Sequence, residues 1–265
     1  MPWTQRPCAQ RPMRYEVAMA VHDFTSERLF LEADLAAGAA VDIADAQANY
    51  LLNVLRLKAG AHLLVFNGRD GEWRAEITGV RKRACTLTVR EQTRVQTSGP
   101  DIQYLFAPLK HARLDYMVQK AVELGVARLT PVLTRRTVPD RVNLERMRAN
   151  AIEAAEQCGV LRIPAVDSPV PLERALARWD AGRTLIFCDE EVPVSGPLRA
   201  LSVLKRGAPV AVLIGPEGGF TGEERQLVGA QPFVLAISMG PRIMRADTAA
   251  VAALTLVNAA AGDWG

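Results

Sequence analysis

The second two thirds of the chain alternate apolar strand-like runs with helix-spaced stretches, and this alternation constrains the fold most. Five apolar runs are predicted strands: 102–109, 129–133, 184–188, 210–214 and 233–237. Between them, apolar residues recur at helical spacing from Leu114 to Gly125 and from Leu144 to Ala155, and an alanine-rich helix is expected over 248–260. Such alternation is typical of a mostly parallel sheet with helices on both faces. An α/β domain is therefore expected over residues 101–265.

The part before residue 96 has a different pattern. Short strands are predicted at 28–31, 61–66, 72–77 and 85–89, with a strong turn signal at 67–71 and one helix at about 45–55. This pattern favours a small β-barrel over residues 27–95. The polar run Gln96–Pro100 is interpreted as a linker. Residues 1–26, with Arg6, Arg11 and Arg14, are expected to form an N-terminal tail.

The composition excludes some classes of protein. The chain has 265 residues, of which 49% are hydrophobic and 23% charged, and a formal net charge of +3. That charge does not by itself indicate a nucleic-acid partner, so local basic patches must carry such an argument. No apolar run is long enough to span a membrane, so we expect a cytoplasmic protein without a membrane partner. The four cysteines form no metal-ligand spacing with one another or with histidine, so no metal site is expected.

A glycine-rich turn follows the apolar run at 210–214. The sequence Gly215-Pro-Glu-Gly-Gly-Phe-Thr-Gly-Glu-Glu224 leads directly into a predicted helix, and Thr221 and Glu224 have the spacing of a capping box. Glycine at the carboxyl end of a strand lets a ligand approach the backbone closely. The turn lacks the G-x-G-x-x-G pattern and the phosphate-binding lysine of nucleotide loops. A ligand-binding turn is favoured, and the alternative is a plain tight turn.

The segment Ser238-Met-Gly-Pro-Arg-Ile-Met-Arg-Ala-Asp-Thr-Ala249 repeats this layout after the run at 233–237. Asp247 or Thr248 is expected to cap the final helix. Arg242 and Arg245 lie beside this second turn. They either face a ligand or form ion pairs on the surface.

Together, the two turns resemble those of the RsmE-type 16S ribosomal RNA uridine-N3 methyltransferases of the SPOUT superfamily. Further similarity to that family lies at Lys110, in QKAVELGV at 119–126, in EAAEQCG at 153–159 and in VLRL at 54–57. One departure is Val160, where the family usually has an arginine; Arg162 follows two residues later. The resemblance extends over about residues 28–260.

The resemblance implies a fold and a cofactor. Residues 101–265 would form a SPOUT domain with a trefoil knot, and residues 27–95 a PUA-like RNA-binding barrel. S-adenosylmethionine would bind in the knot, with the loop that holds Asp189 and Glu190 completing the cleft. The residues implied in cofactor binding are Ile214, Gly215, Pro216, Glu217, Gly218, Ser238, Met239, Gly240, Ile243, Met244 and Arg245. The family also implies a homodimer that acts on 16S ribosomal RNA within the small subunit.

Methylation of uracil N3 requires that the N3 proton leave and that negative charge on the carbonyls be stabilised. Arg245 is our first candidate for stabilising that charge, and Glu217 for accepting the proton. Basic residues predicted to contact RNA are Arg56, Arg81, Lys82, Arg83, Lys110, Lys120, Arg135 and Arg136. The alternative for each is a solvated face. The alternatives for the whole chain are methylation at another RNA position, a non-catalytic RNA-binding module, and a nucleotide hydrolase.

Overall fold

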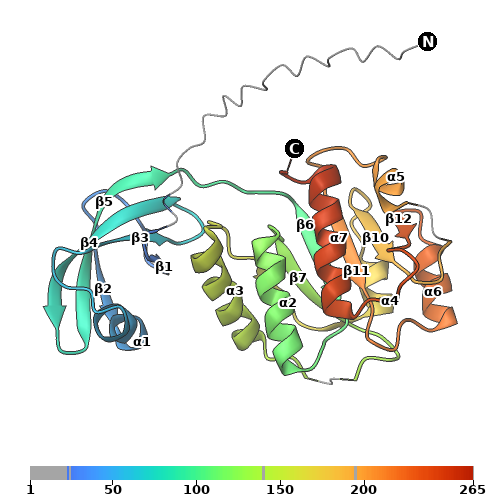
Figure 1. Ribbon diagram of the computed structural model, residues 1–265, viewed down its shortest axis with the longest axis horizontal. Coiled ribbons are helices and arrows are strands. Elements are labelled where there is room, and N and C mark those ends of the chain that lie inside the picture. Colours follow the sequence, from blue (N-terminus) through green and yellow to red (C-terminus); the bar gives the residue numbers. More distant parts are fainter. Residues whose placement is uncertain (1–22, 24, 139–140, 194–195, 265) are drawn as a thin grey trace, which may run out of the picture.

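The computed structural model describes residues 23, 25–138, 141–193 and 196–264. The chain folds into two parts that lie side by side, each built around its own sheet (Figure 1). The tail predicted over 1–26 lies almost entirely outside the described residues.

The first part is a five-stranded sheet. Its strands are β1 (Arg28–Phe30), β2 (Ala40–Ala44), β3 (His62–Phe66), β4 (Glu72–Arg81) and β5 (Ala84–Arg94), in the order β1-β3-β4-β5-β2. All neighbours are antiparallel except β1 and β3. Register shifts interrupt the long β4–β5 ladder, and such irregularities bend a sheet. Among the described residues no ladder joins β1 to β2.

The predicted strands of this part are confirmed, and β2 is the strand that the pattern missed. In β2 the half-buried Val41 and the buried Ile43 alternate with exposed Ala40, Asp42 and Ala44, so a short pattern of period two is present there but was not predicted as a strand. The predicted helix is present as α1 (Asp45–Asn49), which continues into a π-helical segment, η1 (Tyr50–Val54). Leu51 of η1 is fully buried in the core of this part, where it packs with Leu63, Ile77 and Leu87.

The second part is a seven-stranded sheet in which every ladder is parallel. Its strands are β6 (Ile102–Phe106), β7 (Arg128–Leu133), β8 (Ala165–Val166), β9 (Val170–Pro171), β10 (Thr184–Cys188), β11 (Val210–Ile214) and β12 (Val234–Ile237). The order is β12-β10-β11-β6-β7-β8, with β9 beside β7. The α/β prediction is confirmed. Because β10 lies between β11 and β12, the chain that leaves β11 must pass β10 to reach β12. The trefoil knot itself stays a prediction.

Helices cover both faces of this sheet. On one face lie α2 (His111–Glu123), α3 (Leu144–Cys158), α5 (Pro197–Leu201) and α7 (Ala246–Ala261); on the other lie α4 (Leu172–Ala177) and α6 (Gly222–Gly229) (Figure 1). Alternate residues of the central strands pack into the two hydrophobic cores, one on each face of the sheet. Val212 packs toward α2 and α7, and its neighbour Leu213 packs toward α4 and α6. Strands buried on both faces explain the continuous apolar runs.

The two predicted helix caps had different outcomes. Thr221 caps α6 in a full capping box: its Oγ1 accepts from the Glu224 amide, and Glu224 Oε2 accepts from the Thr221 amide at 2.9 Å. The cap predicted for α7 is wrong. Because α7 already begins at Ala246, Arg245 occupies the cap position, without a side-chain cap, and Asp247 lies in the first turn.

Polar contacts join the two parts. The Phe30 amide donates to Glu156 Oε1 of α3 at 2.8 Å, and Arg94 Nη1 donates to the Gly159 carbonyl at 2.8 Å. Arg162 donates from Nη2 to the carbonyls of Pro100 and Gly125, at 2.8 and 2.9 Å. The arginine that stands two residues after Val160 therefore anchors the chain segment between the two sheets.

Candidate functional site

A cavity of about 320 Å³ lies where β10, β11 and β12 end. Parallel strands bring their carboxyl ends to one edge of a sheet, and ligands of open α/β sheets bind at such an edge. Three loops form the walls, one after each strand, and we call the space between them the turn cavity. Its lining residues are Cys188, Asp189, Glu190, Ile214, Gly215, Pro216, Glu217, Gly218, Gly219, Phe220, Met239, Gly240, Arg242, Ile243, Met244, Ala246 and Ala249.

Most of the residues predicted to bind the cofactor line this cavity. They are Ile214, Gly215, Pro216, Glu217, Gly218, Met239, Gly240, Ile243 and Met244. Two others do not line it. Ser238 is buried behind the second turn, where its Oγ accepts from the Gly240 amide at 3.4 Å. Arg245 is exposed and lies outside the lining.

The cavity also contains residues that the sequence patterns did not single out. Gly219 and Phe220 continue the first turn, and Ala246 and Ala249 belong to the first turns of α7. Arg242 was recognised only as a neighbour of the turn, yet it lines the cavity. The loop with Asp189 and Glu190 was expected only through the family resemblance, since nothing in its own pattern indicates a ligand.

The turn after β11 is held by aromatic packing and by an arginine from another loop. Gly215 faces the ring of Phe220, so closely that a Cβ on Gly215 would lie 2.6 Å from Cε2. Phe220 is buried and meets Phe187 edge to face, with ring centroids 5.1 Å apart. On the outer side, Arg136 Nη1 donates to the Gly218 carbonyl at 2.6 Å. The turn is therefore fixed from both sides.

The loop after β10 is fixed by Arg225 of α6. Its guanidinium forms ion pairs with three consecutive acids: Asp189 at 2.9 Å, Glu191 at 2.9 Å, and Glu190. Arg225 Nη1 also donates to the Phe220 carbonyl at 2.8 Å. The Arg225 side chain is only 13% exposed. A single arginine thus joins the loop after β10 to the loop after β11, which form two walls of the turn cavity.

Two side chains in the cavity differ in their capacity for proton chemistry. Burial raises the pKa of the Cys188 thiol to about 12, so it stays protonated near neutral pH and is a poor nucleophile. Glu217 is about half exposed, and its Oε1 accepts from Arg113 Nη1 of α2 at 3.2 Å. Glu217 is therefore an accessible carboxylate at the cavity wall.

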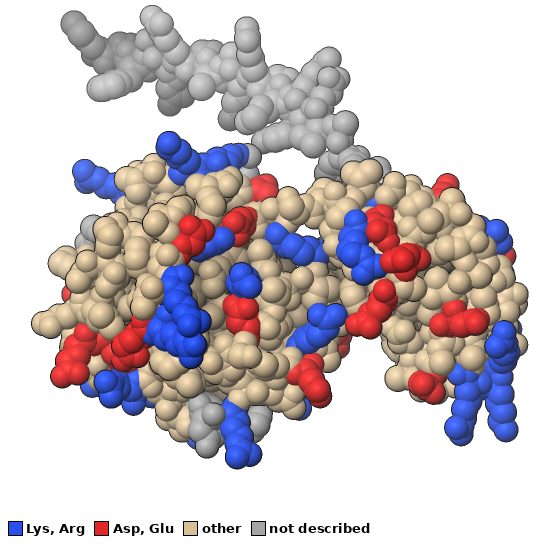
Figure 2. Space-filling model, turned by 180° about the vertical axis from the view of Figure 1, so that it is seen from behind, with Lys and Arg blue, Asp and Glu red and all other residues tan. Residues whose placement is uncertain are grey.

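The basic cluster predicted in the first part lies on an exposed hairpin. Arg81 ends β4, and Lys82 and Arg83 form the tight turn into β5; all three are exposed. Lys82 and Arg83 border a groove of about 410 Å³ that α1 and η1 line from the other side. Figure 2 shows basic side chains projecting from this end of the molecule. Arg56, after η1, is exposed as well.

The basic residues predicted in the second part come from the two ends of α2 and from the loop after β7. Lys120 pairs with Glu123 at 2.6 Å and lies over the Tyr116 ring. The Arg136 guanidinium is engaged with the first turn, whereas the Arg135 side chain is 68% exposed. Lys110 is exposed at the start of α2 and lines a second cavity.

Two kinds of structure are absent from the described residues. In the described part of the chain, no group of three or more histidine, cysteine, aspartate or glutamate side chains is placed to hold a metal ion. Across the same residues, no helix combines the length and the apolar character needed to cross a membrane.

The comparisons with known proteins agree with this geometry. The family model described as "RNA methyltransferase domain" matches residues 97–258, and "RNA methyltransferase PUA domain" matches residues 43–90. Ribosomal RNA small subunit methyltransferase E from Synechocystis is 31% identical over 83% of this chain and 73% of its own. The protein of the same name from Rickettsia conorii is 29% identical over 87% and 94%.

Two solved structures are similar over most of this chain. A methyltransferase from Legionella pneumophila in complex with S-adenosylmethionine has a TM-score of 0.79 and 29% identity, covering 90% of this chain and 99% of its own. The methyltransferase E from Neisseria gonorrhoeae, bound to S-adenosylmethionine, also has a TM-score of 0.79, with 26% identity over 91% and 100%. The chain belongs to the ribosomal RNA small subunit methyltransferase E family.

Proposed function

We propose that this protein transfers a methyl group from S-adenosylmethionine to N3 of a uridine in 16S ribosomal RNA. The observation that carries the proposal is the turn cavity, where nine of the residues implied in cofactor binding come together. Two similar solved structures are described as bound to the same cofactor. The names of the relatives support ribosomal RNA of the small subunit as the substrate.

The lining of the turn cavity fits S-adenosylmethionine chemically. Backbone groups of Gly215 to Gly219 can bind the adenine edge, and Ile214, Met239 and Ile243 offer apolar contact to its faces. The carboxylates of Asp189 and Glu190 suit hydroxyl and ammonium groups. When bound, the cofactor supplies an electrophilic methyl group, so the protein has mainly to position the uracil and manage its N3 proton.

Three side chains are proposed for that task. Glu217 can accept the N3 proton, directly or through water, because it borders the turn cavity and is accessible. Arg245 can stabilise the negative charge that spreads onto the uracil carbonyls. Arg242 competes with Arg245 for this role, since it lines the cavity.

The first part is proposed to dock the RNA. We divide the chain into a tail (1–26), a PUA-like RNA-binding domain (27–95), a linker (96–100) and a methyltransferase domain (101–265). Changing Arg81, Lys82 and Arg83 to alanine should weaken RNA binding and flatten its salt dependence. The slope of the logarithm of the RNA affinity against the logarithm of the salt concentration should become shallower by roughly 0.7–0.9 for each phosphate that the variant no longer neutralises. An unaltered slope would show that these three side chains contact no phosphate and only cover a solvated surface.

The protein is further proposed to be a cytoplasmic homodimer that acts on the small ribosomal subunit. Apart from Asp247 no residue of α7 is charged, and Ile243 beside it is 93% exposed. A helix of this kind is stabilised by burial on more than one side. Light scattering tests the dimer, since a monomer has a mass of 28.9 kDa.

The activity is tested by incubating the purified protein with S-adenosylmethionine and small subunits from a strain that lacks the corresponding enzyme. Digestion of the RNA and mass spectrometry should detect 3-methyluridine at one position. Methylation of a different atom or base would retain the enzyme class and refute the N3 assignment. Cofactor binding without any methylation of RNA would refute the proposed activity.

A further inference from the structure

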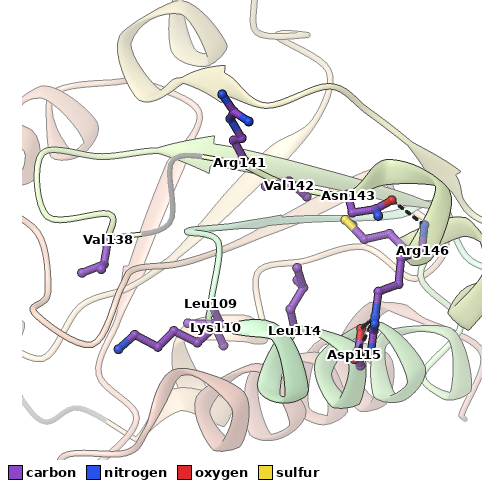
Figure 3. Close-up of a pocket in the computed structure, with 10 residues that line it drawn as sticks. Leu109, Lys110, Leu114, Asp115, Val138, Arg141, Val142, Asn143 and Arg146 are labelled. Carbon is purple, nitrogen blue, oxygen red and sulfur yellow. Dashed lines mark hydrogen bonds and ion pairs between the residues drawn. The ribbon is translucent and has the colours of Figure 1, made fainter.

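A second cavity, of about 610 Å³, lies between the first turns of α2 and α3. We call it the helix cavity. It is lined by Leu109, Lys110, Leu114, Asp115, Val138, Arg141, Val142, Asn143, Arg146 and Met147 (Figure 3). Its volume is within the range of roughly 300–1,000 Å³ that is usual for small-ligand sites. The proposed methyl transfer takes place in the turn cavity and does not occupy the helix cavity.

The floor of the helix cavity is apolar and its margin is basic. Leu109, Leu114 and Met147 form the floor and are buried, and Leu114 points from α2 into the space (Figure 3). In Figure 3 Lys110 lies below the cavity and extends to the left, whereas Arg141 lies above it, and both are exposed. Among the described residues, neither forms an ion pair. Both side chains can be reached from solvent by an anionic ligand.

Two further polar side chains on the wall are already ordered. Arg146 binds Asp115 in a bidentate pair, with Nε–Oδ1 at 3.0 Å and Nη2–Oδ2 at 2.6 Å, and Asn150 donates to the same carboxylate at 2.7 Å. This pair is neutral as a unit, and it stiffens the wall that α2 and α3 share. Three cations and one carboxylate give the lining a net charge of +2.

The helix cavity is close to the turn cavity. Lys110 and Arg113 belong to the start of α2, and Arg113 Nη1 lies 3.2 Å from Glu217 Oε1, on the wall of the turn cavity. One ion pair thus connects the beginning of α2 to the turn after β11. An RNA strand whose target base enters the turn cavity would pass the Arg113–Glu217 ion pair and reach the helix cavity.

We propose that the helix cavity binds a nucleotide of the substrate RNA that neighbours the methylated one. Its base would lie on the apolar floor, and the phosphates on its two sides would contact Lys110 and Arg141, one each. An apolar surface beside exposed cations matches a base joined to phosphates, and RNA is commonly recognised through such unstacked bases. The inference rests on the proposed function, because it takes the substrate to be RNA.

Charge reversal tests the phosphate contact. Arg141→Glu should lower the affinity for small-subunit RNA about tenfold, equivalent to about 1.4 kcal/mol, and should reduce the salt slope by roughly 0.7–0.9 or more. Arg174→Glu is the matched control, because Arg174 is an exposed arginine of α4, on the opposite face of the sheet. Calorimetry with S-adenosylmethionine should give the same cofactor affinity for both variants. Equal RNA affinity in the two variants would overturn the proposal.

Crosslinking tests which molecule occupies the cavity. Val138 stands at its margin and is 72% exposed, and Val203, in the loop after α5, is 71% exposed. Val138→p-benzoylphenylalanine should crosslink to RNA within a few nucleotides of the methylated position, and the same change at Val203 should not. Crosslinks only to a second copy of this chain would overturn the proposal. If the wild-type protein makes no methyluridine but Val138 still crosslinks to RNA, the proposed activity fails and the RNA site stands.

Discussion

Arg136 donates a hydrogen bond from Nη1 to the carbonyl oxygen of Gly218 at 2.6 Å. The arginine follows β7, and the glycine belongs to the turn after β11, so the bond joins two loops that are far apart in the sequence. The stem of Arg136 also packs on Gly218: a Cβ there would lie 3.4 Å from its Cδ. The position of Gly218 therefore depends on Arg136, whereas Gly215 depends on the buried Phe220.

Gly215→Ala should damage the turn cavity more than Gly218→Ala. The added methyl at Gly215 would collide with the Phe220 ring at 2.6 Å, and that ring cannot move freely, because it is buried against Phe187. Overpacking of this kind costs about 1–3 kcal/mol. At Gly218 the neighbour is a flexible arginine stem, which can shift. Thermal unfolding and cofactor calorimetry on both variants check this, and equal damage in the two would contradict it.

Arg225→Met should weaken cofactor binding about tenfold while the protein stays folded. The substitution keeps an unbranched apolar stem but removes the charge that holds Asp189, Glu190 and Glu191, so the three acids repel one another and the loop after β10 moves away. Arg199→Met, at an exposed arginine of α5, is the matched control. Calorimetry gives the affinity and circular dichroism the fold. Wild-type affinity in Arg225→Met would show that the loop holds its position without the arginine.

Cys188 should resist alkylation throughout the pH range in which the enzyme is handled. Burial favours the neutral thiol and raises its pKa to about 12, so the reactive thiolate stays scarce until the pH approaches that value. Iodoacetamide at pH 8, followed by mass spectrometry of the Cys188 peptide, measures the modified fraction. Labelling as fast as that of free cysteine would show that the thiol is accessible and its pKa near the ordinary value.

Glu72→Ala should destabilise the protein strongly, because it leaves a buried arginine without its partner. The side chains of Arg28 and Glu72 are 8% and 2% exposed and form an ion pair, and Thr93 Oγ1 donates to Glu72 at 2.8 Å. Removing one partner of a buried pair costs about 3–5 kcal/mol. Glu91→Ala breaks the exposed pair with Arg74 and should cost about 0–1 kcal/mol. Denaturant unfolding compares the two, and similar midpoints would contradict the prediction.

Much of the fold could be predicted from local sequence patterns. Strands β6, β7, β10 and β11 are largely buried between two layers of helices and β12 is half-buried at the sheet edge, so each appears as an apolar run. The capping box of Thr221 and Glu224 marks the start of α6. The short elements β8, β9, α4 and α5 were not predicted. They have two to six residues each, too few for a periodicity to emerge, and the ladders of β8 and β9 depend on β7.

The site was predictable where its residues are consecutive. The glycines after β11 and β12 mark their turns directly. The contacts of Arg136 with Gly218 and of Arg225 with Asp189 were not predictable, because they join loops that only the sheet order brings together. The sequence around each of these arginines does not differ from that around an arginine on a solvated surface. The helix cavity was missed for the same reason, since α2 and α3 contribute one wall each.

Arg245 and Arg242 can be separated by their effects on turnover and on RNA affinity. Arg245 is at the cap position of α7 and is exposed, whereas Arg242 lines the turn cavity. A guanidinium that stabilises charge on the uracil carbonyls acts mainly in the transition state, so its removal lowers turnover and leaves RNA affinity nearly unchanged. A guanidinium that binds an RNA phosphate acts in the ground state too, so affinity falls with activity. We expect Arg245→Lys to show the first pattern, because lysine keeps the charge but not the fixed fork of donors.

Single-turnover methylation with saturating cofactor measures the chemical step, and RNA titration under the same conditions measures the affinity. Arg242→Lys is the matched comparison, since it makes the same change three residues earlier, on the wall of the cavity. A lower rate with unchanged affinity in Arg245→Lys alone would assign the carbonyl to Arg245. The same result in Arg242→Lys alone would assign it to Arg242. Near-normal turnover in both Arg245→Ala and Arg242→Ala would remove both arginines from the chemistry and leave Glu217 and Lys110 as the side chains to test.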